Sequence, residues 1–461
     1  MFRALRQHST LPCFPKQPPR RSRSSLASNA GSQSMIYDAI VVGAGAAGLL
    51  AAITAAERGR KTLLLEKNPR PGIKILMSGG TRCNLTQHTN IRGIVEAYGD
   101  QGRFLHSALA DLSPADLVKL IEEEGVPTKI EETGKIFPVS DRASDIVDAL
   151  VRRLTRSGAE LALREPANEI VPTDRQFEIV TPLRRLVSTA VVVTTGGLSY
   201  PGSGTTGDGY AWARKLGHTI IETRPALTPL TTNDRWVQEL TGLTIADVLV
   251  QVVPGPDIGE AVPPALSLRR SKGTKRGVLA EQRGSFLFTH FGLSGPAVLD
   301  VSRAVTSHPQ PQTLQLLCDF LPDRKTELFD EQLRAECAAD GKRQALGVVS
   351  RHVPRRLAES IFQQLGLPSE LRGAELSKRD RSRIVELVKQ CRIQLSGALG
   401  YKKAEVTAGG VALHEVDSKT MQSKLVPGLF FAGEVLDLDG PIGGYNFQAA
   451  FSTGRLAGLH A

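Results

Sequence analysis

The stretch "YDAIVVGAGAAGLLAAITAAERGRKTLLLEKN", residues 37–68, decides the fold. An apolar run at residues 39–42 predicts a buried parallel strand, and three glycines follow it in the spacing GxGxxG. Residues 49–58 then predict an Ala-rich helix, and a second apolar run, residues 62–65, ends at Glu66. A strand, a glycine turn, a helix and a second strand ending in an acid are typical of a dinucleotide-binding Rossmann unit.

Each glycine of this unit meets a geometric need. Gly43 allows the tight turn, Gly45 lets the backbone approach a pyrophosphate, and Gly48 lets the helix pack closely. Glu66 follows Gly43 by 23 residues, a spacing that places its carboxylate to accept hydrogen bonds from the ribose of an adenosine half. We therefore predict a dinucleotide site here; the alternative is a glycine-rich helix start that binds nothing.

Two later stretches indicate which dinucleotide binds. Residues 188–209 read as another buried strand entering a glycine-rich turn, and residues 426–458 give a strand, the pair Gly433-Glu434, and a glycine-rich loop that opens an Ala-rich helix. A simple NAD dehydrogenase does not need a distant C-terminal segment to return to the first sheet. An extended FAD does, because its ribityl and flavin halves must be held beyond the first unit. We therefore predict FAD.

The chain has no second GxGxxG with a strand before it and an acid after it. A dedicated nicotinamide domain is therefore not expected. NAD(P)H would bind transiently over the flavin, or oxygen would reoxidise the enzyme. Five widely spaced cysteines without a CxxC, and nine histidines without a metal-binding spacing, predict neither disulfides nor a metal site.

The composition, 41% hydrophobic and 23% charged residues, is that of a globular protein with two or three domains, and no apolar run is long enough to span a membrane. Of the net charge of +10, residues 1–34 carry +6, and no acid precedes Asp38. Such an Arg- and Ser-rich leader predicts a mitochondrial transit peptide. A plastid peptide, a disordered tail, or a cytoplasmic protein that starts at Met35 are the alternatives. The remaining +4 predicts no nucleic-acid partner.

The middle of the chain changes character twice. Short apolar runs such as "DVLVQVV" and "GSFLFTHF" predict strands in residues 221–321, and helical apolar spacing predicts helices in residues 322–395. Residues 268–283 hold six basic residues and one acid; they predict a solvated hairpin, or a contact with an acidic partner or with NADPH phosphates. His290 either bonds the backbone or faces the substrate.

Five motifs stand in a fixed order: "GIKILMSGGTRCNLT", "GGLSYPGSGTTGDGYAWARKLGH", "FLFTHFGLSGPAVLDVS", "VTAGGV" and "GLFFAGEVLDLDGPIGGYNFQAAF". From about Tyr37 to the C-terminus the chain resembles the glutathione-reductase-type FAD fold, and more narrowly the BaiN/YhiN-like family of NAD(P)/FAD-dependent oxidoreductases. The resemblance implies an α/β architecture. A Rossmann-like FAD-binding domain, residues 36–220 and 396–461, would be interrupted by a β-barrel-like insert, residues 221–321, and a helical part, residues 322–395, after a leader at residues 1–35.

The resemblance also implies a set of cofactor contacts. The fingerprint and its acid would hold the ADP half, Gly433 and Glu434 would meet the ribityl chain and pyrophosphate, and the loop after them would approach the flavin. The predicted cofactor-binding residues are Gly43, Gly45, Ala46, Ala47, Gly48, Glu66, Lys67, Lys74, Ser78, Gly79, Gly80, Arg82, Cys83, Asn84, Thr195, Gly196, Gly197, Gly433, Glu434, Gly443, Gly444, Tyr445, Asn446 and Gln448.

The loop around Cys83 departs from the family at one position. The family reads SGxGRCN, but Thr81 stands where it has glycine. If this position has a positive φ, the threonine is strained by on the order of 1–2 kcal/mol. Otherwise the loop turns differently, or Gly79 and Gly80 adopt the unusual dihedral angles instead.

Two residues are candidates for catalysis. Arg82 could lower the pKa of the Cys83 thiol, but no second cysteine is near enough to exchange a disulfide, so a packing role beside the cofactor is the favoured interpretation. Tyr445 could act as an acid, stack on a ring, or pack at a domain seam. The resemblance implies hydride transfer through flavin N5 between NAD(P)H and a small organic substrate, with reduction of an activated C=C bond as the reaction. The alternatives are an oxygen-using amine or aminoketone oxidase, a ligand-binding protein without turnover, and a nucleic-acid-modifying flavoprotein.

Overall fold

The computed structural model describes residues 36–255 and 277–461. The predicted leader and most of the basic stretch at residues 268–283 lie outside the described residues. Within the described ranges, no helix is both long and apolar enough to cross a membrane.

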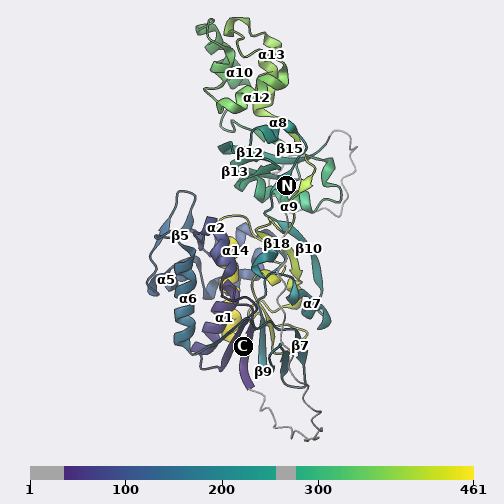
Figure 1. The fold of residues 1–461 in the computed structure, drawn as a ribbon. Coiled ribbons are helices and arrows are strands. Elements are labelled where there is room, and N and C mark those ends of the chain that lie inside the picture. The colour runs from purple at the N-terminus through teal and green to yellow at the C-terminus, as the bar shows by residue number, and fades with distance from the viewer. Residues whose placement is uncertain (1–35, 256–276) are drawn as a thin grey trace, which may run out of the picture. The chain divides into compact units, whose positions relative to one another are not determined.

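A seven-stranded sheet forms the first part of the fold (Figure 1). Its strands run in the order β6-β2-β1-β9-β8-β7, and β19 also pairs with β9. The pairs around β1 and β9 are parallel, except that β7 and β8 form an antiparallel extension. The bounds are β1 Ile36–Val42, β2 Thr62–Glu66, β6 Glu160–Leu163, β7 Glu169–Pro172, β8 Phe177–Val180, β9 Arg185–Val193 and β19 Leu429–Phe431. The Rossmann-like sheet predicted from residues 37–68 is confirmed.

Two helices from opposite ends of the chain pack against each other beside this sheet (Figure 1). They are α1, Ala46–Glu57, and α14, Tyr445–His460. Their backbones come so close that a Cβ added at Gly454 would lie 2.2 Å from the carbonyl oxygen of Ala47. Only small residues permit this approach. All of α1 except Glu57 is buried, which agrees with its unbroken apolar sequence.

Smaller elements complete this part. They include a three-stranded sheet, β3 Thr86–Gln87, β4 Thr128–Ile130 and β5 Lys135–Pro138, and an antiparallel pair, β10 Ile220–Ala226 and β18 Val406–Val411. The helices are α2 Ile73–Thr81, α3 Ile91–Ala97, α4 His106–Asp111, α5 Pro114–Glu123, α6 Ala143–Ser157 and α7 Asp208–Lys215.

A second sheet with its own hydrophobic core lies between β10 and β18 in the sequence. Its seven strands run in the antiparallel order β16-β15-β12-β13-β14-β11-β17. The bounds are β11 Leu230–Thr231, β12 Thr244–Pro254, β13 Ala280–Thr289, β14 Gly292–Ser294, β15 Leu314–Asp319, β16 Cys391–Gln394 and β17 Gly397–Ala398. The helices are α8 Arg235–Glu239, α9 Pro296–Thr306, α10 Thr326–Ala339, α11 Ala345–Val349, α12 Arg355–Leu365 and α13 Lys378–Lys389.

Two elements differ from the sequence prediction. Helix α9 lies in the stretch predicted as strands, because Pro296 follows Gly295 at the first helical position, where proline favours a helix start. Residues 391–394 form a strand where a helix was predicted, because Cys391 and Ile393 alternate with exposed neighbours and pair with β15. The domain boundaries at residues 220, 321 and 395 stay predictions.

The close approach of α1 and α14 gives a test by substitution. Gly454→Ala places a methyl group against the Ala47 carbonyl, so the helices must separate. Although alanine is the better helix former, we expect the free energy of unfolding in urea to fall by about 1–3 kcal/mol. Gly202→Ala, where an added Cβ meets nothing within 4 Å, is the control. A Gly454→Ala protein as stable as this control would contradict the close packing.

Candidate functional site

A cavity of about 630 Å³ opens at the carboxyl ends of β1, β2 and β9. This volume is typical of small-molecule and cofactor sites. Most of the predicted cofactor contacts line its wall: Gly43, Gly45, Ala46, Ala47, Glu66, Lys67, Lys74, Ser78, Gly79, Gly80, Arg82, Asn84, Thr195, Gly196, Gly433, Glu434, Gly443, Gly444 and Asn446. Gly48, Cys83, Gly197, Tyr445 and Gln448 do not.

The three fingerprint glycines occupy different surroundings. Gly43 has a φ of +104°, and a Cβ there would lie 2.8 Å from the carbonyl oxygen of Thr194. At Gly45 a Cβ would meet nothing within 4 Å, so this backbone faces the open cavity. At Gly48 a Cβ would lie 1.8 Å from the carbonyl oxygen of Gly43, so this glycine serves packing rather than a ligand.

Glu66 is fixed at the edge of the cavity by three hydrogen bonds. One carboxylate oxygen, Oε2, accepts from the backbone N–H of Ala44, at 2.8 Å. The other, Oε1, accepts from the backbone N–H and the side-chain amide of Asn68, each at 2.8 Å. Each carboxylate oxygen has two lone pairs, so these bonds leave capacity for the hydroxyl groups of a ribose.

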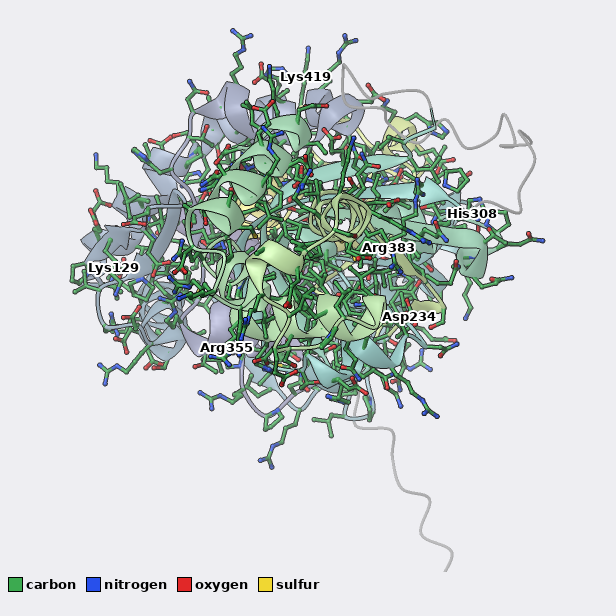
Figure 2. All side chains as sticks on the ribbon, turned by 90° about the horizontal axis from the view of Figure 1, so that it is seen from above. Lys129, Asp234, His308, Arg355, Arg383 and Lys419 are labelled. Carbon is green, nitrogen blue, oxygen red and sulfur yellow. The ribbon has the colours of Figure 1, made fainter. Side chains whose placement is uncertain are left out.

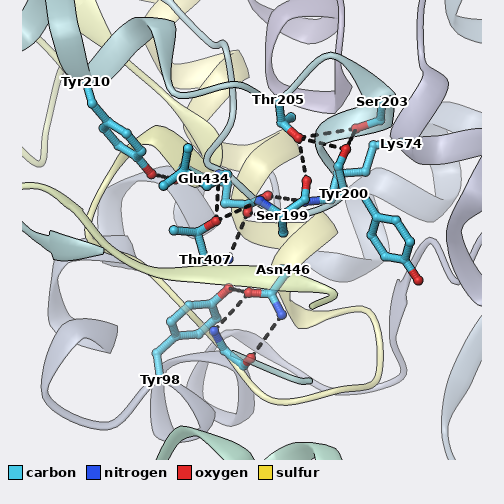
Figure 3. Close-up of polar contacts among 12 residues, drawn as sticks. Lys74, Tyr98, Ser199, Tyr200, Ser203, Thr205, Tyr210, Thr407, Glu434 and Asn446 are labelled. Carbon is cyan, nitrogen blue, oxygen red and sulfur yellow. Dashed lines mark hydrogen bonds and ion pairs between the residues drawn. The ribbon is translucent and has the colours of Figure 1, made fainter. Parts of the chain in front are cut away.

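A polar network joins four segments of the chain at the cavity wall (Figure 3). The Lys74 ammonium on α2 donates to Ser199 Oγ, at 2.6 Å, and forms an ion pair with Glu434. Glu434 Oε1 accepts from Ser199 Oγ, at 2.6 Å, and from the backbone N–H of Thr407 on β18, at 2.9 Å. Glu434 is therefore fully engaged by the protein. The sequence prediction included Lys74 and Glu434 but missed Ser199 and Thr407.

The loop after Met77 concentrates unusual backbone conformations. Gly79 and Gly80 have φ values of +56° and +67°, and Thr81 and Cys83 also have positive φ values, +71° and +63°. The glycines therefore adopt left-handed conformations, but they do not relieve Thr81. The Thr81 hydroxyl donates to the neighbouring carbonyl of Gly80, at 2.5 Å, and the Thr81 side chain is exposed.

Cys83 does not have the environment of a reactive thiol. Its side chain is fully buried, and burial raises the pKa of the thiol to about 12, so the nucleophilic thiolate is disfavoured. Arg82 does not counteract this effect. Its guanidinium donates to Glu131, at 2.6 Å, lies 3.4 Å from Asp141, and stacks on Phe137. Its side chain is part of the hydrophobic core, which supports the packing role favoured from the sequence over the catalytic one.

Three further predicted contacts are not part of the cavity wall. Tyr445 is half-buried and lies outside the cavity wall. Gln448 is fully buried, and its amide bonds Thr86, Leu112 and Ser452, so no part of it is left for a cofactor. At Gly197 a Cβ would lie 2.4 Å from Thr407 Oγ1, which makes its role one of packing.

The cavity fits the adenine dinucleotide that the sequence predicts. Two buried oxygens in residues that line the wall, Asn84 Oδ1 and Thr195 Oγ1, have no hydrogen-bond partner within the described residues. Buried polar atoms of this kind are normally satisfied, and the polar atoms of FAD would satisfy them. The backbone at Gly443 and Gly444 enters the long helix α14, whose positive end favours an anionic ring edge.

Several wall residues were not predicted from the sequence. They lie in the β4–β5 hairpin, at the ends of helices and strands, and, for Tyr200 and Ile442, in glycine-rich loops: Tyr98, Glu131, Lys135, Phe137, Glu165, Tyr200, Leu227, Glu405 and Ile442. For His290 the sequence analysis predicted either a hydrogen bond to the backbone or a position facing the substrate. The His290 side chain is exposed, and its ring packs edge-on against Phe291.

Asp300 on α9 links the part of the fold that contains the second sheet to the glycine-rich loop that precedes α14. Its Oδ1 accepts from the backbone N–H of Ile442, at 2.8 Å, and its Oδ2 accepts from the Gln282 amide, at 3.3 Å. Burial raises the pKa of the Asp300 carboxyl to about 6, against the opposing hydrogen bond from Ile442 and the charge of Lys135.

Comparison with known proteins gives full-length matches. The family described as "HI0933-like protein Rossmann domain" matches residues 37–460. A protein of Escherichia coli K12 named "Ribosomal RNA dihydrouridine synthase" is 35% identical over 418 residues, 90% of this chain and 96% of that protein. A protein of the same name from Haemophilus influenzae is 32% identical over 91% of this chain and 97% of its own length. The "3-dehydro-bile acid delta(4,6)-reductase" of Clostridium scindens is 28% identical, over 91% and 98% respectively.

The names of these relatives bear on one prediction. The expectation that nucleic acid is not a partner is not borne out, because two relatives are named for ribosomal RNA. That expectation rested on a total charge of +4 outside the leader. A total does not report how charge is distributed, and a local basic cluster can contact phosphates on a nearly neutral protein.

The left-handed Thr81 predicts a gain of stability on substitution. Thr81→Gly removes the steric cost of the positive φ, about 1–2 kcal/mol, and this gain is partly offset by the greater entropy of the unfolded chain. We expect the free energy of unfolding to rise by about 0.5–1 kcal/mol, and FAD to bind equally well or more tightly. Thr133→Gly, at an exposed threonine without a positive φ, should lower stability. A large loss of flavin from Thr81→Gly would instead assign the hydroxyl a role of its own.

Asp300 predicts a pH-dependent loss of stability. Because its pKa is raised by folding, its contribution is fully present below the unfolded pKa, near 4, and is lost as the pH rises through about 6. Asp300→Asn keeps an oxygen for the Ile442 N–H but cannot ionise. Its stability relative to wild type should therefore rise over this window, by on the order of 1 kcal/mol in urea unfolding. Asp247→Asn is the control of opposite sign, because Arg283 lowers the pKa of Asp247. Parallel pH profiles of Asp300→Asn and wild type would contradict the assignment.

Proposed function

This chain belongs to the HI0933-like Rossmann family of FAD-dependent oxidoreductases, and on that premise we propose that it reduces the 5,6 double bond of uridine in ribosomal RNA. The observation that carries this proposal is the 35% identity over 96% of the length of the Escherichia coli protein named for this product. Dihydrouridine differs from uridine only by two hydrogen atoms, on C5 and C6. The C5=C6 bond is conjugated to the C4 carbonyl, so it accepts hydride as an activated double bond.

The residues of the cavity would divide the work of holding FAD. The turn at Gly43 and Gly45 would hold the pyrophosphate, with Glu66 on the ribose. The backbone amides at Gly443 and Gly444 would face the flavin. FAD supplies the hydride, while the protein sets its position and electrostatic surroundings. The apolar side chains of Leu227 and Ile442, which also line the cavity, would help to exclude water from the flavin ring.

An RNA substrate requires positive charge outside the cavity. The stretch from Lys378 to Arg392 contains six basic residues and two acidic ones. Arg383 on this stretch and Arg355 on α12 are among the surface side chains shown in Figure 2, and Arg355 is 77% exposed. Lys389 and Arg381 of this stretch are largely buried in ion pairs with Asp319 and Asp330. The exposed side chains of Lys378, Arg379 and Arg392 are the charges of the stretch that support a contact with phosphates. The target uridine would have to leave its stack to reach a cavity of this size.

NAD(P)H is the reductant in this proposal. The absence of a second fingerprint from the sequence supports a transient contact rather than a resident nicotinamide domain. The composition of residues 1–34 supports import into a mitochondrion, where the substrate would be the ribosomal RNA of that organelle. A plastid location, or a cytoplasmic one with translation from Met35, are the alternatives.

A small-molecule enone is the second candidate substrate. The 28% identity with the Clostridium scindens reductase, over 98% of its length, favours it. Both candidates share one reaction class, reduction of a carbon–carbon double bond conjugated to a carbonyl. They differ in what surrounds that bond, and substrate choice is a property of the site rather than of the fold.

The test is an anaerobic reaction of the purified flavoprotein. With NADH or NADPH and an unmodified ribosomal RNA transcript, we expect flavin bleaching near 450 nm, a region typical of oxidised flavins, and dihydrouridine in the digested RNA by mass spectrometry. A 4-ene-3-keto steroid is the parallel substrate. Reduction of the steroid alone would favour the second candidate. Hydrogen peroxide formed from an amine, without any reduced product, would instead indicate an oxidase.

A matched pair of variants links activity to the cavity. Gly45→Val adds a side chain at the cavity wall, where an added Cβ meets no protein atom within 4 Å, so we expect a folded, colourless and inactive protein. Gly202→Val, at an exposed glycine outside the cavity wall, should keep its flavin and its activity. Retention of FAD by a folded Gly45→Val protein would contradict the assignment of this cavity to the cofactor.

A further inference from the structure

Six carboxylates line the cavity, and five of them are engaged by the protein. Glu66 bonds Ala44 and Asn68, and Glu434 bonds Lys74, Ser199 and Thr407. The remaining three engaged acids form ion pairs: Glu131 with Arg82, Glu165 with Arg184 and Asp208 with Lys67. Within residues 36–255 and 277–461, no hydrogen bond or ion pair joins the sixth carboxylate, that of Glu405.

The backbone around Glu405 is held firmly. Its N–H donates to the carbonyl of Leu227, at 3.0 Å, at the end of the β10–β18 pair. Two residues later, Thr407 Oγ1 accepts from the backbone N–H of Leu198, at 2.8 Å, and of Ser199, at 3.1 Å. Leu227 also lines the cavity and has a φ of +49°, a strained conformation for a non-glycine residue. The Glu405 carboxyl group, which has no partner within the described residues, is thus carried at the cavity wall by a backbone that hydrogen bonds hold in place.

We propose that Glu405 is the catalytic residue that donates the proton when the activated double bond is reduced. This inference rests on the proposed function. The cavity holds both a carboxylate that is paired with a cation and one that has no partner within the described residues. Such different surroundings separate the pKa values of two carboxyl groups, so that one can serve as an acid while the other stays ionised. Glu434 is the carboxylate that pairs with a cation, Lys74, and Glu405 is the proposed acid.

The reaction balances in atoms and electrons. In the proposed step the carbon–carbon π bond would break, and the carbon farther from the carbonyl, C6 in uridine, would receive the hydride that reduced FAD supplies. Glu405 gives its proton to the adjacent carbon, C5, so that two C–H bonds form. FAD is oxidised and the double bond is reduced. The Glu405 carboxylate then takes a proton from water, and NAD(P)H reduces FAD again.

The electrostatic surroundings agree with this role. Burial raises the pKa of the Glu405 carboxyl, the charge of Lys74 opposes this shift, and the charge of Glu434 reinforces it. Tyr200, which also lines the cavity, is the other titratable group that interacts with Glu405. A carboxyl with a raised pKa keeps its proton nearer to neutral pH, which a general acid requires. Neither predicted catalytic residue, Tyr445 nor Cys83, lies on the cavity wall.

The test separates the two halves of the reaction in Glu405→Gln, with Glu405→Asp as the conservative variant. We expect FAD binding to the apoprotein, followed by quenching of FAD fluorescence, and flavin reduction by NAD(P)H to match wild type. Oxidation of the reduced flavin by the double-bond substrate in a single turnover should slow by about 100-fold or more in Glu405→Gln, and Glu405→Asp should recover part of the rate. Glu222→Gln, at an 85% exposed glutamate side chain on β10, is the matched control and should behave as wild type.

The pH profile gives an independent signature. The donor must be protonated, so the wild-type rate of substrate reduction should fall as the pH rises through the pKa of Glu405, and this step should vanish in Glu405→Gln. Oxidation of reduced Glu405→Gln at the wild-type rate, with an unchanged pH profile, would overturn the role of Glu405 alone. If the wild-type enzyme itself reduces neither uridine nor an enone, the proposed function fails, whatever the variants show.

Discussion

The close contact between the first and the last helix is the constraint on which the cavity depends. Helix α1 begins at the fingerprint, and α14 begins at the glycine-rich loop, so their packing places two segments 400 residues apart on one cavity wall. Glycines at Gly454 and Gly458 let the backbones approach, because any side chain there would collide with carbonyl oxygens of α1. A cofactor that extends across a sheet needs this convergence, and glycine provides it without a polar interaction.

The sequence predicted those parts of the fold that local rules determine. A short strand, a tight glycine turn and an Ala-rich helix are set by residues that are neighbours in the chain, so the fingerprint could be read directly. The direction of side chains on α14 could not. Asn446, Phe447, Ala449 and Ala450 line the cavity, whereas Tyr445 and Gln448, three residues apart on one helix face, do not. The resemblance to a family identified the glycine-rich loop and the start of α14, but it did not show which side chains of the helix line the cavity.

The residues that determine the chemistry of the site were even harder to predict from the sequence. Glu405 stands before an apolar strand with no glycine fingerprint of its own, and it reaches the cavity only because β18 pairs with β10, 180 residues earlier in the chain. Cys83 shows the opposite case. A cysteine beside an arginine looks reactive in the sequence, but the fold buries the thiol and pairs the guanidinium with two acids. Burial and pairing are properties of the whole chain, so neither follows from the immediate neighbours.

The path of the chain through β10 and β18 has a consequence for how such proteins diversify. The polypeptide leaves the cofactor-binding part of the fold after β10 and returns to it on β18, and these two strands pair with each other, with Leu227 bonded to Glu405 at their end. A segment whose two ends are already adjacent can be lengthened, exchanged or reshaped in evolution without moving the residues that hold the cofactor. One cofactor-binding fold can thus acquire new substrates through changes in the segment between β10 and β18. This accords with relatives of this chain that are named for an RNA nucleoside and for a bile acid.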